Sequence, residues 1–239
     1  QKATILSKKN KHRLAINYLE KSLDFSEDPY EIWTLLGMEH MKLNDYTKAK
    51  RYFNFCLKID INDYQSLYNI LYCYDELKEF NNSIALLNSI LEKKPYNEIA
   101  WFELGKQYLK LKKNKEALSA FDFAIISEEK FVGAYIEKGK VLEKMGKLPE
   151  AIEHFEISMQ FEDPSSFIFS KIGQCHQKLK NHQIAAKFYK KSIALDPSNI
   201  DAWNKIIDFY IEINRYKKAI SYLESFLKID YDNIESWEK

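Results

Sequence analysis

The residues best suited to chemistry are five histidines and three cysteines, the side chains that often bind metals or act as nucleophiles. Cys175 and His176 are adjacent, and neighbouring side chains on a helix point about 100° apart, so they cannot chelate one metal ion together. The chain has no Cys-x-x-Cys, no His-x-x-x-His and no glycine-rich phosphate loop. The sequence therefore indicates no enzyme, and we predict neither a metal site nor a cofactor.

Amphipathic helices are the elements that would position these side chains. Between Ala100 and Ile126, two sets of residues recur at steps of three and four, so each set shares one helix face. The first set is Trp101, Leu104, Gly105, Tyr108 and Leu111, and the second is Ala117, Phe121, Ala124 and Ile125. The short polar stretch Lys112–Lys115, with Asn114, suits a tight turn between them. Neither helix can bury its apolar face alone, so the pair needs neighbours.

The same pattern recurs every 34 residues without slipping in register. The large residue at Trp101 has equivalents at Trp33, Leu67, Tyr135, Phe169, Trp203 and Trp237. The small residue at Ala117 has equivalents at Ala15, Ala49, Ser83, Ala151, Ala185 and Ala219. The large residue at Phe121 has equivalents at Leu19, Phe53, Leu87, Phe155, Tyr189 and Leu223.

This pattern resembles the tetratricopeptide repeat, in which an aromatic stands at position 4, Leu-Gly at 7 and 8, Tyr at 11, Ala at 20 and 27, an aromatic at 24 and Pro at 32. The copy that begins at Glu98 matches with Trp101, Leu104, Gly105, Tyr108, Ala117, Phe121 and Ala124. The resemblance implies an all-α, right-handed α-solenoid of helix-turn-helix repeats, in which each repeat contacts its neighbours. It implies a binding scaffold without naming the ligand.

The repeat phase predicts a single solenoid over residues 1–239. It comprises a partial repeat at 1–29, full repeats at 30–63, 64–97, 98–131, 132–165, 166–199 and 200–233, and the start of another at 234–239. Because Trp237 would lack a second helix to cover it, we expect the chain to be a piece of a longer solenoid. Leu71 and Ile207 replace the close-contact glycine, and we expect the helix pair at Leu71 to be pushed apart slightly.

In the repeat phase, the histidines and cysteines favour packing roles. His40 and His176 take the position of Tyr108, and Cys73 and Cys175 precede that position by one residue. We interpret His154 as a surface residue and Cys56 as a small packing residue, with all three cysteines free.

Composition narrows the classes of partner and compartment. With 36 Lys plus Arg against 35 Asp plus Glu, the net charge of +1 gives no electrostatic reason to expect nucleic acid. No apolar run approaches the length of a membrane span. Three cysteines cannot form a full disulfide set, which favours a reducing compartment, so we predict a cytoplasmic protein.

The family resemblance places a binding groove along the first helices, at positions 2, 5, 6, 9, 12 and 13. These positions grade from apolar and aromatic, through alternating charge that includes Glu103 and Glu143, to polar. The predicted groove residues are Met38, Tyr68, Asn69, Tyr72, Phe102, Lys106, Glu137, Lys140, Lys171, Gln174 and Asn204.

The groove does not match the carboxylate clamp with which one subclass of the family binds the acidic tails of chaperones. Asn69 occupies its slot, but Thr34, Met38, Ile99 and Glu103 occupy the other four. We therefore expect a protein or peptide partner other than a chaperone tail. The alternative is a structural subunit that packs through its ends or faces in a larger assembly. The sequence leaves the oligomeric state open.

Overall fold

In the computed structural model, which describes residues 2–229, every regular element is a helix. The helices are α1 (Lys2–Lys8), α2 (His12–Leu23), α3 (Tyr30–Lys42), α4 (Tyr46–Ile59), α5 (Tyr64–Glu76), α6 (Phe80–Lys93), α7 (Glu98–Lys110), α8 (Asn114–Ser127), α9 (Val132–Lys144), α10 (Leu148–Phe161), α11 (Ser166–Lys178), α12 (His182–Leu195), α13 (Ile200–Glu212) and α14 (Tyr216–Ile229). First helices begin every 34 residues from Tyr30, and second helices every 34 from His12. The predicted all-α class of paired repeating helices is confirmed.

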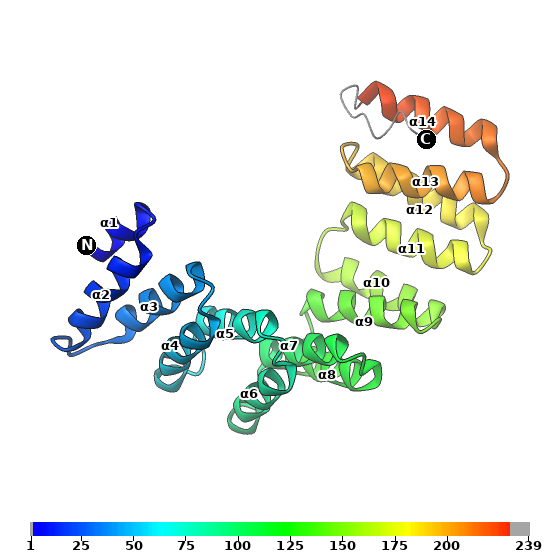
Figure 1. Cartoon of the computed structure of the whole chain (residues 1–239). Coiled ribbons are helices and arrows are strands. Elements are labelled where there is room, and N and C mark those ends of the chain that lie inside the picture. The colour runs from blue at the N-terminus through cyan, green and yellow to red at the C-terminus, as the bar shows by residue number, and fades with distance from the viewer. Residues whose placement is uncertain (1, 230–239) are drawn as a thin grey trace. The chain divides into compact units, whose positions relative to one another are not determined.

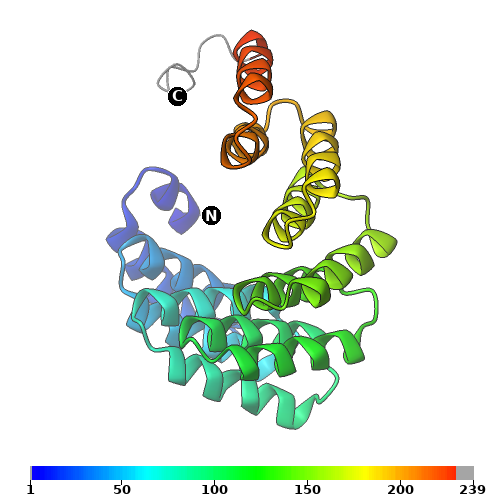
Figure 2. The same ribbon diagram turned by 90° about the vertical axis from the view of Figure 1, so that its right-hand side faces the viewer.

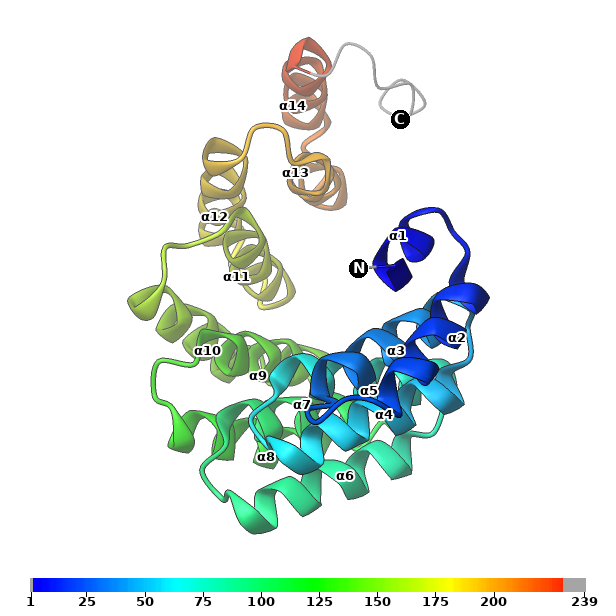
Figure 3. The ribbon, with the colours of Figure 1, turned by 90° about the vertical axis from the view of Figure 1, so that its left-hand side faces the viewer.

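The chain divides into two compact units, which are described separately: unit 1 (Gln1–Lys113, α1–α7) and unit 2 (Asn114–Lys239, α8–α14). Within each unit, consecutive helices pack against one another as hairpins (Figures 1, 2 and 3). The boundary falls between α7 and α8, inside the repeat 98–131. A single solenoid over the whole chain thus stays a prediction, and the prediction on Trp237 lies outside the described residues.

Glycine allows the first and second helices of a repeat to approach closely. A Cβ placed on Gly37 or Gly139 would lie 2.6 Å from the ring of Phe53 or Phe155, and one on Gly173 would lie 2.9 Å from the ring of Tyr189. Each of these three rings is fully buried. The ring therefore occupies the space that any other side chain at the glycine would need.

The two full repeats that lack this glycine also lack the ring. Leu71 faces a second helix whose core residue is Leu87, and Ile207 belongs to a repeat with Leu223 at that position. The backbones of α5 and α6 run close together over a shorter stretch than those of α3 and α4. The expected separation of the helix pair at Leu71 is therefore confirmed.

Each turn inside a helix pair has the same backbone geometry. The residue after the C-cap of the first helix has a positive φ of 55–60°, or 77° at Gly146, and recurs every 34 residues from Asn10 to Asn214. In the first full repeat, Asn44 N donates to Met41 O and Asp45 N donates to His40 O, both at 2.9 Å. These bonds form a Schellman motif, which satisfies carbonyls that the helix end leaves unpaired. Only Gly146 is a glycine, although glycine adopts this conformation most easily.

Side-chain caps start several of the first helices. The side chains of Asp63, Asn97, Ser165 and Asn199 each accept a hydrogen bond from the amide three residues further on. These residues close one 34-residue repeat and satisfy an otherwise unpaired N–H group of the next.

Candidate binding face

Unit 1 carries three exposed, largely apolar side chains at predicted groove positions. Met38 on α3 is 38% exposed, and Tyr68 and Tyr72 on α5 are 42% and 46% exposed. Because Tyr68 and Tyr72 are four residues apart on one helix, both rings emerge on the same face. Met38 and Tyr72 hold position 9 in successive repeats. We call Met38, Tyr68 and Tyr72 the unit 1 patch.

Side chains on neighbouring helices act on both tyrosines of the patch. The Tyr72 ring meets the Tyr46 ring edge-on at a centroid distance of 6.0 Å, and a hydrogen bond with Tyr46 and the negative charge of Glu76 raise the Tyr72 pKa. Burial and the negative charge of Glu103 on α7 raise the pKa of Tyr68. Both phenols are therefore neutral at physiological pH, and each can donate one hydrogen bond.

The remaining predicted groove residues of unit 1 are less accessible. Phe102 on α7 is partly buried, with the ammonium of Lys106 5.3 Å from its ring centroid. Lys106 also donates to Glu103 at 2.8 Å. Glu103 is only 4% exposed, which corrects the expectation that it lines an open groove. Asn69 on α5 is partly buried and accepts a weak hydrogen bond from Gln65 at 3.5 Å.

The charged residues among the predicted groove residues of unit 2 form ion pairs on its first helices. On α9, Lys140 donates to Glu137 at 2.7 Å. On α11, Lys171 donates to Gln174 at 3.3 Å and reaches Glu143 of α9 at 3.0 Å. Asn204 lies partly buried on α13. These side chains present both signs of charge on one face. They can therefore orient a segment that carries charges of both signs, but they do not select for a segment with a net positive or net negative charge.

Glu143 connects two lysines across α9 and α11. It is buried and accepts hydrogen bonds from Lys171 at 3.0 Å and Lys178 at 2.7 Å. Burial alone would raise the pKa of Glu143, but hydrogen bonds from the two lysines lower it below its ordinary value. The carboxylate is thus ionised at neutral pH and holds the two helices together.

The list of predicted groove residues omits one exposed ring in unit 2. Phe167 on α11 is 40% exposed, and the ammonium groups of Lys140 and Lys171 lie 5.1 and 5.8 Å from its ring centroid. Phe167 holds position 2 of its repeat, which is one of the groove positions. The same positional rule could therefore have identified it. Cation–π contact explains how two lysines surround the ring.

A second buried carboxylate, Glu39, joins three helices of unit 1. It accepts hydrogen bonds from Ser7 at 2.6 Å, His12 at 2.8 Å and Lys42 at 2.8 Å. Burial would raise the pKa of Glu39, but these donors lower it. No repeat-wide signal predicts this cluster, because the donors lie in three separate helices and hold different repeat positions.

His40, His154, His176 and the three cysteines are packed side chains. The rings of His40 and His176 stack on Tyr52 and Phe188 at centroid distances of 5.5 and 5.8 Å. This confirms the packing roles expected of both residues at the position of Tyr108, and His40 is buried. His154 is partly buried, and burial lowers its pKa, which corrects its interpretation as a surface residue.

The predicted free cysteines Cys56, Cys73 and Cys175 are unpaired and buried. Burial raises the pKa of Cys73 and of Cys175 to about 11, so both thiols are poor nucleophiles at neutral pH. Within residues 2–229, no three metal-binding side chains are gathered to hold an ion. Over the same range, no helix has the length and apolar character to cross a membrane.

Three solved structures show what this fold resembles. The C-terminal part of a TPR repeat-containing protein from Cytophaga hutchinsonii has a TM-score of 0.71 and 14% identity, and the match covers 99% of this chain and 97% of that one. One chain of the APC/C hetero-tetramer Cut9–Hcn1 has a TM-score of 0.61 and 19% identity, and the match covers 96% of this chain and 45% of that one. YrrB, described as a TPR protein with an unusual peptide-binding site, has a TM-score of 0.56 and 18% identity over 78% of this chain and 96% of its own.

Sequence comparison identifies the family. No curated protein matches this chain significantly in sequence. The profile of the tetratricopeptide repeat matches residues 1–29, 30–62, 168–199 and 200–233, which together make up more than half of the chain. Solenoids of this repeat generally act as scaffolds for protein–protein interaction and are typically non-catalytic. The chain belongs to the tetratricopeptide repeat family.

Proposed function

We propose that this chain is a non-catalytic scaffold that binds a partner segment along its first helices, with the unit 1 patch as the main contact. The observation that supports this proposal is the exposure of Met38, Tyr68 and Tyr72 on the face where the family resemblance places the groove. A tyrosine that is held by its neighbours offers a large contact area at a small cost in conformational entropy.

The partner segment has an apolar or aromatic anchor beside a stretch of mixed charge. The anchor contacts the rings of Tyr68 and Tyr72. The ion pair Lys140–Glu137 on α9 favours a segment that carries both signs of charge. Because the helices are already folded, the scaffold loses little conformational entropy when it binds.

Photo-crosslinking of a selected peptide tests where the partner binds. Peptides are selected by display against the intact chain, and the tightest binder is labelled with a diazirine on its aromatic or apolar anchor. Mass spectrometry should find the crosslinks on α3, α5 and α7. Crosslinks confined to the second helices α4 and α6 would contradict the proposal.

A second candidate function is that of a subunit in a larger assembly, as is the matching chain of the APC/C hetero-tetramer Cut9–Hcn1. The observation that favours it is a pair of exposed apolar side chains one turn apart on α14, Tyr216 and Ile220, which are both more than half exposed. Sedimentation of the chain with and without Ile220→Glu distinguishes the two candidates. An oligomer that forms with rising concentration in the wild type and dissociates to a monomer in the Ile220→Glu variant would favour the assembly subunit.

A further inference from the structure

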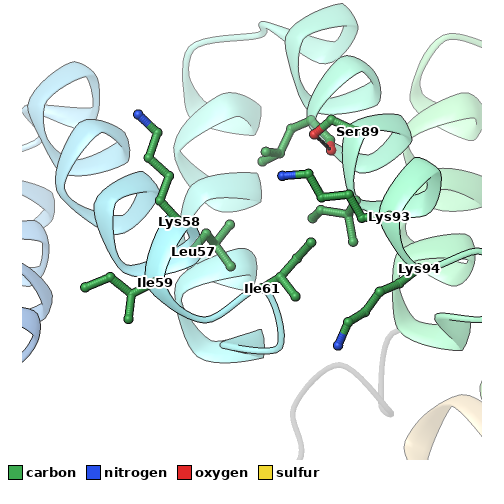
Figure 4. Close-up of a pocket in the computed structure, with 9 residues that line it drawn as sticks. Leu57, Lys58, Ile59, Ile61, Ser89, Lys93 and Lys94 are labelled. Carbon is green, nitrogen blue, oxygen red and sulfur yellow. Dashed lines mark hydrogen bonds between the residues drawn. The ribbon is translucent and has the colours of Figure 1, made fainter.

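A recess lies between two second helices of unit 1, α4 and α6, and contains none of the predicted groove residues. It has a volume of about 350 Å³. Its lining consists of Leu57, Lys58, Ile59, Ile61, Leu86, Ser89, Ile90, Lys93 and Lys94. Five of these nine side chains are aliphatic, three are lysines and none is acidic. Figure 4 shows Lys93 extending from α6 toward the gap, while Ile61 points into it from the turn after α4.

The three lysines of this recess are not engaged in ion pairs with other described residues. Lys58 and Lys93 are exposed, and Lys94 donates to the neutral amide oxygen of Asn62 at 2.6 Å. Lys58 lies 5.8 Å from the ring centroid of Phe55. Among the ion pairs that the structure records for residues 2–229, none includes Lys58, Lys93 or Lys94.

The internal repeats show that this charge is particular to the α4–α6 recess. Lys94 holds position 31 of its repeat, where the other five full repeats all carry an acid: Asp60, Glu128, Glu162, Asp196 and Asp230. The position of Lys93 is held elsewhere by Ile59, Ser127, Phe161, Leu195 and Ile229. The helix-turn-helix scaffold therefore needs no lysine at either position. Lys93 and Lys94 are thus not required for folding, which favours a role in binding.

We propose that the α4–α6 recess binds an acidic protein segment with one aliphatic or aromatic anchor. The anchor enters between Leu57, Ile61 and Ile90, and flanking carboxylates pair with the three lysines. Apolar burial supplies affinity, and the lysines select against basic and neutral sequences. This surface is separate from the unit 1 patch, so the chain can hold two segments at once.

Fluorescence polarisation with defined peptides tests the proposal on the full chain. The probe is a labelled twelve-residue peptide with a central Leu flanked by Glu, and its comparison peptides carry Lys or Gln in place of each Glu. The acidic peptide should bind at least about tenfold more tightly than either comparison peptide, and added salt should reduce the difference. Equal binding of all three peptides would overturn the proposal.

Charge reversal locates the binding site. Lys93→Glu/Lys94→Glu should abolish the preference for the acidic peptide. Ile61→Ser should lower the affinity for the acidic peptide without changing the preference for it over the comparison peptides. The matched control Lys112→Glu/Lys113→Glu makes the same charge change at two adjacent exposed lysines of unit 1 and should leave binding unchanged. An unchanged preference in the Lys93→Glu/Lys94→Glu variant would also overturn the proposal.

Two further measurements separate this proposal from other readings. Tyr72→Ala should leave acidic-peptide binding intact, because Tyr72 belongs to the unit 1 patch, and a loss of binding there would place the peptide on that patch instead. Vesicles of phosphatidylcholine with phosphatidylserine should not bind at physiological salt. Vesicle binding that is lost in the Lys93→Glu/Lys94→Glu variant, together with weak binding of all peptides, would assign the recess to a membrane surface and refute a protein partner.

Discussion

The contact between Gly139 and Phe155 gives the sharpest prediction about stability. Replacing Gly139 with Ala adds about 1 kcal/mol of favourable helix propensity, but it places a methyl group 2.6 Å from a fully buried ring. Such overpacking costs about 1–3 kcal/mol, so the net loss should be about 1 kcal/mol. Gly139→Leu inserts a whole side chain and should cost about 3 kcal/mol. For a chain of this size, that corresponds to a lowering of the melting temperature by roughly 6–12 °C.

Two repeats of this chain show how the loss can be reversed. Leu71 belongs to a repeat with Leu87 in place of the ring, and Ile207 to one with Leu223. Phe155→Leu alone should cost about 1–2 kcal/mol through the cavity that it leaves. In combination with Gly139→Leu it should restore most of the stability, with a coupling energy of about 2 kcal/mol or more.

Circular dichroism during thermal and urea unfolding measures all four members of this mutant cycle. Gly173→Ala provides a graded comparison and should cost less than Gly139→Ala, because the nearest ring atom is 2.9 Å away rather than 2.6 Å. If Gly139→Leu unfolds at the wild-type temperature, or if the double variant is no more stable than Gly139→Leu, the reasoning about this contact is refuted.

Three further predictions concern turns, charges and thiols. Lys180 has a φ of 60°, which glycine adopts at a lower cost, so Lys180→Gly should stabilise the chain by up to about 1 kcal/mol in urea unfolding. Gly146→Ala should destabilise it by about as much. If Lys180→Gly destabilised the chain and Gly146→Ala stabilised it, the assigned turn would be contradicted. The folded pKa of Glu143 is below its ordinary value of 4.5, so its contribution to stability is present above that pH and is lost as the pH falls below it. Urea unfolding of Glu143→Gln should therefore depend less on pH between about pH 5 and 3 than wild type does, whereas the exposed control Glu224→Gln should behave as wild type. A thiol reagent should find all three cysteines in denaturant without reductant and should react slowly with the native chain, and the finding of one thiol or fewer after denaturation would contradict free cysteines.

The repeat phase predicts the helices well because the 34-residue period constrains every repeat at once. It predicts the position of each paired helix, the small residue at the crossing and the loosened pair at Leu71. It does not predict the left-handed turn residue, because lysine holds that place in three repeats and has no preference for a positive φ.

Exposure in the groove is harder to predict from position alone. Glu103 and Tyr68 both hold groove positions, yet Glu103 is buried beside Lys106 while Tyr68 is exposed. The difference comes from contacts with neighbouring helices, which a pattern within one repeat does not contain. The same reason explains why Glu39 was not predicted, since its donors come from α1, α2 and α3.

The affinity of a selected peptide for patch variants tests the central claim most directly. The claim is that the unit 1 patch is the main contact with a partner segment. Isothermal titration compares the wild type with Tyr68→Ala/Tyr72→Ala and with Tyr96→Ala, a matched control whose tyrosine is 77% exposed in the turn before α7. If both patch tyrosines are hot spots, each truncation should cost about 2 kcal/mol or more of binding free energy. The helicity of the variants and the affinity of the Tyr96→Ala control should stay unchanged. Unchanged affinity in the Tyr68→Ala/Tyr72→Ala variant would contradict the claim and favour the assembly subunit.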